Sequence, residues 1–117
     1  MTPEPIIDLT TYEALKDAMG ADFMDELLQA YYDETPQLLN KLQRALEDQD
    51  CESFRMAAHS IKSTSKSFGA MQFGELAREL EMIGREGKLE SSHGKVEQLV
   101  ESYKIVRQAF EGLNHDQ

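Results

Sequence analysis

Residues 51–69 read CESFRMAAHSIKSTSKSFG, and this run separates into two faces when it is placed on an α-helix. At ~100° per residue, Lys62, Ser63 and Lys66 all lie within about 60° of His59. The opposite side holds residues expected in a core, namely Phe54, Ile61, Ser65 and Phe68. The pattern therefore predicts a helix that buries one face and exposes His59 to solvent beside positive charge.

An exposed imidazole among ammonium groups is a suitable place for a phosphoryl group, because its unpaired nitrogen is nucleophilic and the cations attract phosphate. A free imidazole titrates near ~6.5, so much of it is neutral and reactive at neutral pH. We therefore predict that the chain carries phosphate on His59. The alternative is a surface histidine without chemistry, with Lys62 and Lys66 as ordinary solvated lysines. For Lys66 both interpretations stay open.

The overall charge limits the partners. The chain has 117 residues, which suits one domain over 1–117, and its formal net charge is −10. Such a surface repels nucleic acid and anionic membranes, so any phosphate must meet a local group of cations such as Arg55, Lys62 and Lys66. We expect Arg55 to pair with Glu52 or Asp48 in preference to phosphate.

The remaining composition favours a soluble, cytoplasmic protein. Cys51 is the single cysteine, so no internal disulfide can form. No apolar run is long enough to span a bilayer. We expect His93 in a link and His115 in a tail, where neither has companion ligands at metal spacing.

Outward from residues 51–69, every well-patterned segment repeats with a helical period, which indicates an all-α protein. The predicted helices are 11–19, a long helix that starts at Asp22 as its cap and ends at a turn over 48–50, then 51–67, 71–86 and about 96–110. Gly20, Gly69 and Gly87 are placed as C-terminal stops. On the long helix we predict an apolar stripe of Phe23, Leu27, Tyr31, Leu38, Leu42 and Leu46.

Short links between helices of similar length favour antiparallel neighbours. We therefore predict an up-down-up-down four-helix bundle with a core over about 22–113 and a short additional N-terminal helix across one end. Pro36 interrupts the long helix, but the apolar spacing resumes in phase after it, which favours a kink over a division into two helices.

The run His59, Ser60, Ile61, Lys62, Ser63, with Phe68 and Gly69 after it, resembles the signature of the histidine-containing phosphotransfer (HPt) domain family. That signature is histidine, any residue, an apolar residue, lysine, a small residue and a later glycine. The resemblance covers roughly 22–110 and implies a four-helix bundle with the histidine exposed in the middle of a helix. It also implies a phosphocarrier of multistep phosphorelays, without kinase activity of its own.

The resemblance assigns roles to particular residues. His59 would accept the phosphoryl group on Nε2, Lys62 would contact the phosphoryl oxygens, and Lys66 would add positive potential. Glu81 stands where the family often has a glutamate or glutamine that holds the other ring nitrogen. Ser63 departs from the usual glycine, which could narrow the range of partners that can approach.

The implied partners are receiver domains of response regulators and hybrid histidine kinases. The resemblance also implies that the receiver would supply the aspartate and its magnesium. This sequence shows neither a P-loop nor a clustered acidic ligand set with which it could hold magnesium nucleotide itself. We expect a monomer that binds no cofactor itself. Two alternatives stay open: a helical adaptor without chemistry, and the phosphoacceptor module of a larger hybrid kinase.

Overall fold

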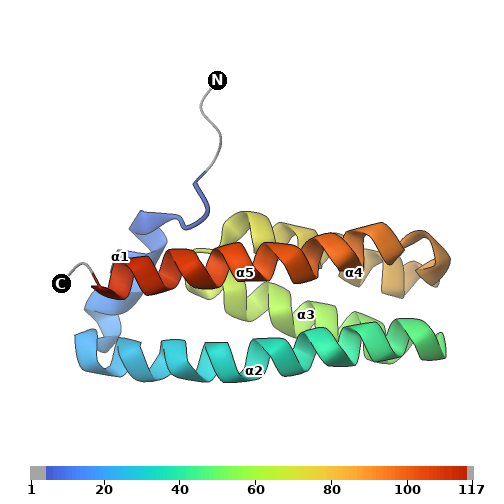
Figure 1. The fold of residues 1–117 in the computed structure, drawn as a ribbon, viewed down its shortest axis with the longest axis horizontal. Coiled ribbons are helices and arrows are strands. Elements are labelled where there is room, and N and C mark those ends of the chain that lie inside the picture. Colours follow the sequence, from blue (N-terminus) through green and yellow to red (C-terminus); the bar gives the residue numbers. More distant parts are fainter. Residues whose placement is uncertain (1–4, 116–117) are drawn as a thin grey trace.

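The computed structural model describes residues 5–115, and its regular structure is entirely helical (Figure 1). The helices are α1 (Leu9–Met19), α2 (Ala21–Asp48), α3 (Cys51–Ser67), α4 (Met71–Glu86), the 3₁₀ turn η1 (Leu89–Ser91) and α5 (His93–His115). The predicted all-α class is confirmed. Within the described residues, no helix combines the length and the apolar character needed to cross a bilayer.

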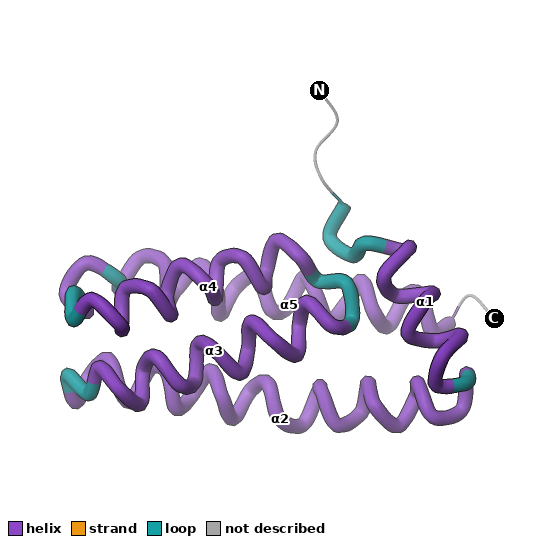
Figure 2. The backbone as a smooth tube through the Cα atoms, turned by 180° about the vertical axis from the view of Figure 1, so that it is seen from behind, coloured by secondary structure: helices purple, strands orange, loops and turns teal. Residues whose placement is uncertain are grey.

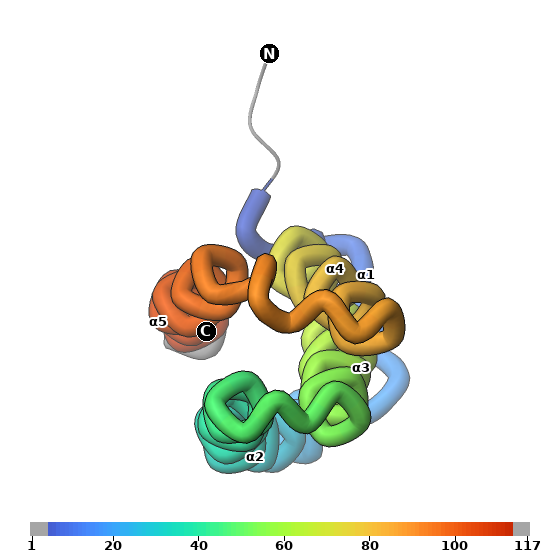
Figure 3. The backbone as a smooth tube through the Cα atoms, turned by 90° about the vertical axis from the view of Figure 1, so that its right-hand side faces the viewer, coloured from blue at the N-terminus to red at the C-terminus, as the bar shows by residue number. Residues whose placement is uncertain are grey.

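Helices α2, α3, α4 and α5 run alternately in opposite directions along one long axis (Figures 1 and 2). Viewed from the end, they occupy the four corners of a bundle, with α2 beside α3, α3 beside α4, and α5 closing the ring between α4 and α2 (Figure 3). Helix α1 crosses the end of the bundle where α2 begins and contacts α2 and α3. This is the predicted up-down-up-down bundle with a short additional N-terminal helix.

Helices α3 and α4 have the predicted bounds, and their ends show why. Asp50 caps α3: its carboxylate accepts hydrogen bonds from the backbone N–H of Ser53 at 3.1 Å and from the Ser53 hydroxyl at 2.7 Å. Gly69 (φ 100°) and Gly87 (φ 72°) take the positive φ angles that end helices without a Cβ penalty. Gly20 (φ 87°) ends α1 in the same way, so all three predicted glycine stops are confirmed.

The other bounds differ from the prediction. Helix α1 begins at Leu9, two residues early, and α2 begins at Ala21, so Asp22 lies in its first turn and is not the cap. Helix α2 runs without a break through Pro36.

Helix α5 starts at His93 and extends to His115, so the two histidines are its first and last residues, not a link and a tail. The early start has a physical cause. Leu89 is buried and fixes η1, and the carbonyl of Ser92 then accepts the N–H of Val96 at 2.9 Å.

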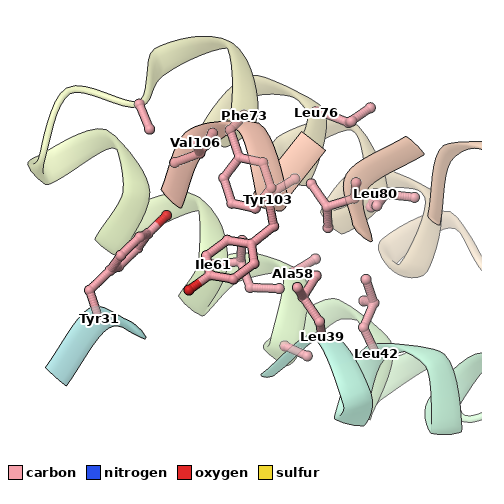
Figure 4. Packing of buried hydrophobic residues seen from close by; sticks show 14 of the residues in the cluster. Tyr31, Leu39, Leu42, Ala58, Ile61, Phe73, Leu76, Leu80, Tyr103 and Val106 are labelled. Carbon is pink, nitrogen blue, oxygen red and sulfur yellow. The ribbon is translucent and has the colours of Figure 1, made fainter. Parts of the chain in front are cut away.

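The core lies along the bundle axis (Figure 4). On α2 the buried residues are Met24, Leu28, Tyr31, Tyr32, Thr35, Leu39, Leu42, Ala45 and Leu46. The predicted stripe was therefore one position off in places: Phe23 is exposed, and Leu27 and Leu38 are only partly buried. Buried residues also reach beyond 22–113 on the N-terminal side, to Ile7 and Tyr12.

One polar pair lies inside this core. The hydroxyl groups of Tyr31 on α2 and Ser65 on α3 are 2.8 Å apart and buried. Burial is the main reason why the pKa of Tyr31 is raised well above its usual range, and the bond to Ser65 opposes it. The pair joins α2 to α3 at the level of the aromatic cluster around Phe68 and Phe110.

Two glycines of α4 allow it to approach α3 very closely. A Cβ at Gly84 would lie 3.0 Å from Cδ1 of Phe54 and 3.1 Å from the backbone nitrogen of Arg55. A Cβ at Gly74 would lie 2.5 Å from Cγ of Lys66. Because these two positions lack side chains, α3 and α4 lie close together, and polar side chains of one helix can reach those of the other.

Candidate functional site

His59 lies in the middle of α3, and its side chain is 52% exposed. Ile61 and Ser65 on the opposite face are buried, as are Phe54 and the cap residue Phe68. The outward direction predicted from the helical period is therefore observed, and a docking protein can reach the ring.

The inner edge of the ring is held by a carboxylate from the neighbouring helix. Nδ1 of His59 lies 2.8 Å from Oε2 of Glu81 on α4, whose side chain is only 5% exposed. A carboxylate only accepts hydrogen bonds, so Nδ1 carries the proton and Nε2 carries the lone pair. Because the buried carboxylate holds Nδ1 on the inner side of a half-exposed ring, Nε2 lies on the more open side, and within the described residues no hydrogen bond to it is found.

Lys62 shares the same carboxylate. Its Nζ lies 2.8 Å from Oε1 of Glu81, and a guanidinium nitrogen of Arg85 lies 3.5 Å from Oε2. Burial alone would raise the pKa of Glu81, but the hydrogen bonds from Lys62 and His59 and the positive charge of Lys62 outweigh it, so this pKa lies below its ordinary value. Glu81 is therefore a stable anion that uses both oxygens.

The other cations of the predicted patch have partners of their own. Lys66 pairs with Glu75 at 3.1 Å, and Glu75 also accepts a hydrogen bond from Arg78 at 2.5 Å. Arg55 pairs with Glu52, as predicted, at 2.5 Å.

Of the predicted site residues, the structure thus joins His59, Lys62 and Glu81 in one cluster. Lys66 lies outside this cluster, further along α3. Ser63 is exposed, with its backbone carbonyl bonded to the hydroxyl of Ser67. In the described residues, no group of three or more His, Cys, Asp or Glu side chains could hold a metal ion.

The sequence reasoning missed two features. The first is the ion pair between Arg85 and Glu81. It could have been predicted, because oppositely charged residues four positions apart on one helix lie side by side. A groove of about 430 Å³ also lies between α2 and α3, lined by Leu38, Lys41, Arg44, Ala45, Asp48, Asp50, Ser53, Met56 and Ser60. It reaches Ser60, the residue next to His59, and its exposed Met56 lies one helical turn before the histidine.

Comparison with known proteins agrees with this geometry. The sequence model of the Hpt domain matches residues 26–109. This chain belongs to the Hpt domain family. It is 22% identical over 103 residues to histidine-containing phosphotransfer protein 1 of Arabidopsis thaliana, covering 86% of this chain and 67% of that protein.

Two solved structures share the fold of this Hpt domain. Histidine-containing phosphotransfer protein B (HptB) of Pseudomonas aeruginosa PAO1 superposes with a TM-score of 0.90 at 28% identity, covering 98% of this chain and 99% of that one. The HPT domain of the Hpt sensor hybrid histidine kinase from Shewanella superposes with a TM-score of 0.71 at 18% identity, covering 94% and 98%. At 18% identity, the similarity to the Shewanella domain shows a shared fold only.

Family membership confirms the resemblance and the functional class predicted from the sequence. The domain has a histidine phosphotransfer role in phosphorelays, in which Hpt domains are phosphocarriers that interact with receiver domains.

Proposed function

We propose that His59 is the phosphoacceptor, which takes a phosphoryl group from the aspartate of one receiver domain and passes it to the aspartate of another. The observation that carries this proposal is that the two ring nitrogens of His59 have different environments. Nδ1 is bound to buried Glu81 at 2.8 Å, while Nε2 projects from a half-exposed side chain. The nucleophilic lone pair therefore faces the direction from which a partner arrives.

Phosphoryl transfer depends mainly on alignment and charge compensation. Lys62 lies one turn from His59 and would place its ammonium on the phosphoryl oxygens, while Lys66 would add positive potential from the next turn. The hydroxyl of Ser63 is exposed on the same face and would donate to a phosphoryl oxygen. The receiver supplies the aspartate and magnesium, and this chain acts without kinase activity.

The receiver would dock over His59 and the groove between α2 and α3. Exposed Met56 offers an apolar contact, and the groove is bordered by charged residues of both signs, Lys41 and Arg44 beside Asp48 and Asp50. An apolar centre with a polar rim is typical of a specific protein interface. We place this exchange in the cytoplasm and take the domain to act as a monomer.

The test is incubation with magnesium and a phosphorylated receiver, followed by mapping of acid-labile phosphate by mass spectrometry. We expect label on His59, none on His59→Gln, and transfer to Lys62→Ala that is slower by about 10-fold or more. His93→Gln, at the far start of α5, is the matched control and should label normally.

Two results would contradict the proposal. Label that persists in His59→Gln would move the acceptor elsewhere. A chain that binds receivers but takes up no phosphate would instead be a helical adaptor.

A further inference from the structure

If His59 is the phosphoacceptor, as proposed above, phosphorylation of Nε2 changes how strongly the ring holds its proton on Nδ1. When the Nε2 lone pair forms the N–P bond, the bond between phosphorus and the aspartyl oxygen breaks, and its electron pair restores the aspartate carboxylate. The ring then carries phosphorus on Nε2 and a proton on Nδ1, so it is a cation. In water such a ring readily loses the Nδ1 proton.

The proton matters for the return step. If Nδ1 keeps it, the group that leaves phosphorus is neutral imidazole, which is a good leaving group. If Nδ1 has lost it, the leaving group is an imidazolate anion, and transfer must wait for a proton to return. A carrier that passes phosphate in both directions therefore benefits from retaining this proton.

We propose that Glu81 keeps the Nδ1 proton on His59 throughout the phosphorylated state, so that the phosphoryl group enters and leaves without any proton transfer. Glu81 is thus a positioning residue that also fixes the charge of the ring. This role depends on His59 being the acceptor and extends it to the chemistry of donation.

The geometry supplies what this role needs. Oε2 of Glu81 already accepts the Nδ1 hydrogen bond at 2.8 Å. The side chain of Glu81 is only 5% exposed, and at a buried site the Coulomb attraction between two charges is screened far less than in water. Its other oxygen is bonded to Lys62 at 2.8 Å, so the carboxylate cannot easily turn away or take up a proton. A cation formed on the ring would therefore face an anion at hydrogen-bond distance.

The other charged groups nearby do not replace Glu81. On α4, Arg85 lies 3.5 Å from the same oxygen but is 66% exposed. On α3, Lys62 is bound to Glu81, and Arg55 is paired with Glu52. On α2, the charged residues that line the neighbouring groove are Lys41, Arg44 and Asp48, all exposed. Among the residues described by the structure, Glu81 is the one carboxylate in contact with the ring.

The direct test is an NMR titration of the phosphorylated ring. The protein is labelled with ¹⁵N and phosphorylated with phosphoramidate, and the Nδ1 resonance of His59 is followed from acidic to alkaline pH. We expect the native ring to hold its Nδ1 proton to a pH at least about one unit above that of free phosphohistidine, a tenfold change in proton affinity. In Glu81→Gln, which keeps an acceptor oxygen without the charge, the titration should return towards the free compound.

Kinetics give a second readout. Phosphoryl donation from each protein to one receiver is measured across the same pH range, and the variant rate is divided by the native rate to cancel the receiver's own pH dependence. For Glu81→Gln we expect this ratio to fall about 10-fold per pH unit once its ring has lost the proton. Glu75→Gln, a carboxylate of α4 that contacts Lys66 and Arg78 but not His59, is the matched control and should follow the native protein.

The outcomes separate the two proposals. Phosphate found elsewhere than on His59 refutes the proposed acceptor. Phosphate on His59 of a native protein whose Nδ1 titrates like free phosphohistidine overturns the role of Glu81 alone, and so does a pH-independent rate ratio. If Glu81→Gln does not fold, the titration of the native protein still decides.

Discussion

Gly84→Ala tests whether the close approach of α3 and α4 is a real constraint. Alanine is favoured over glycine inside a helix by about 1 kcal/mol, so propensity alone predicts a more stable protein. The new Cβ, however, would lie 3.0 Å from the ring of Phe54, and 3.1 Å and 3.2 Å from the backbone nitrogen and Cα of Arg55. Neither the fully buried ring nor the α3 backbone can move without shifting the whole helix.

Overpacking of this kind costs about 1–3 kcal/mol. After the gain in propensity of about 1 kcal/mol is subtracted, we expect the free energy of unfolding to fall by up to about 2 kcal/mol and Tm to fall by up to about 8 °C. The assay is chemical and thermal denaturation followed by circular dichroism. Because Glu81 lies one turn from Gly84, separation of the helices should also lengthen its bond to His59 and slow phosphoryl uptake.

Gly112→Ala is the matched control, since a Cβ there meets nothing within 4 Å. This variant should be as stable as the parent or more so. If Gly84→Ala were stabilised to the same extent, the argument that glycine is required for close packing would be refuted.

Three further expectations concern the caps, the core and the response to acid. Asp50→Ala removes the acceptor of the Ser53 N–H and should lower Tm by about 4 °C in a thermal melt. Tyr31→Phe leaves the buried hydroxyl of Ser65 without its partner and should lower the free energy of unfolding in urea by about 1–2 kcal/mol. Adding Ser65→Ala should recover part of this loss. If the losses of the two single variants simply added in the double variant, the pairing would be contradicted. Because the pKa of Glu81 is lowered in the folded state, its stabilisation is present at neutral pH and is lost as the pH falls below about 4.3, so Glu81→Gln should flatten the acid limb of the stability curve.

Much of the fold follows from local signals in the sequence. The bounds of α3 and α4 are predictable because Asp50, Gly69 and Gly87 mark their ends. The buried face of α2 is not, because adjacent apolar pairs such as Phe23 and Met24 leave the choice to tertiary packing, and polar Thr35 interrupts the visible stripe. The start of α5 was missed because glycine at position 94 disfavours a helix, and the buried turn before it provides the compensation.

The site too could be predicted from the sequence only in part. The outward face of His59 follows from the helical period within one segment. Its contact with Glu81, 22 residues away, depends on how two helices are set against each other, so it came only from the family resemblance. That setting is determined by Gly74 and Gly84, whose close contacts are visible only in three dimensions.

The cluster of His59, Lys62 and Glu81 is contained in a single hairpin, α3 and α4, joined by residues 68–70. The corner is rigid, because Gly69 receives the N–H of Asp8 at 2.8 Å and leaves no room there for a Cβ. Extra residues inserted at this corner would change the register of the two helices and separate the ring from its carboxylate. Insertions at 49–50 or 87–88, outside the hairpin, would leave that register intact, so chain length can vary at these turns while the reactive group stays in place.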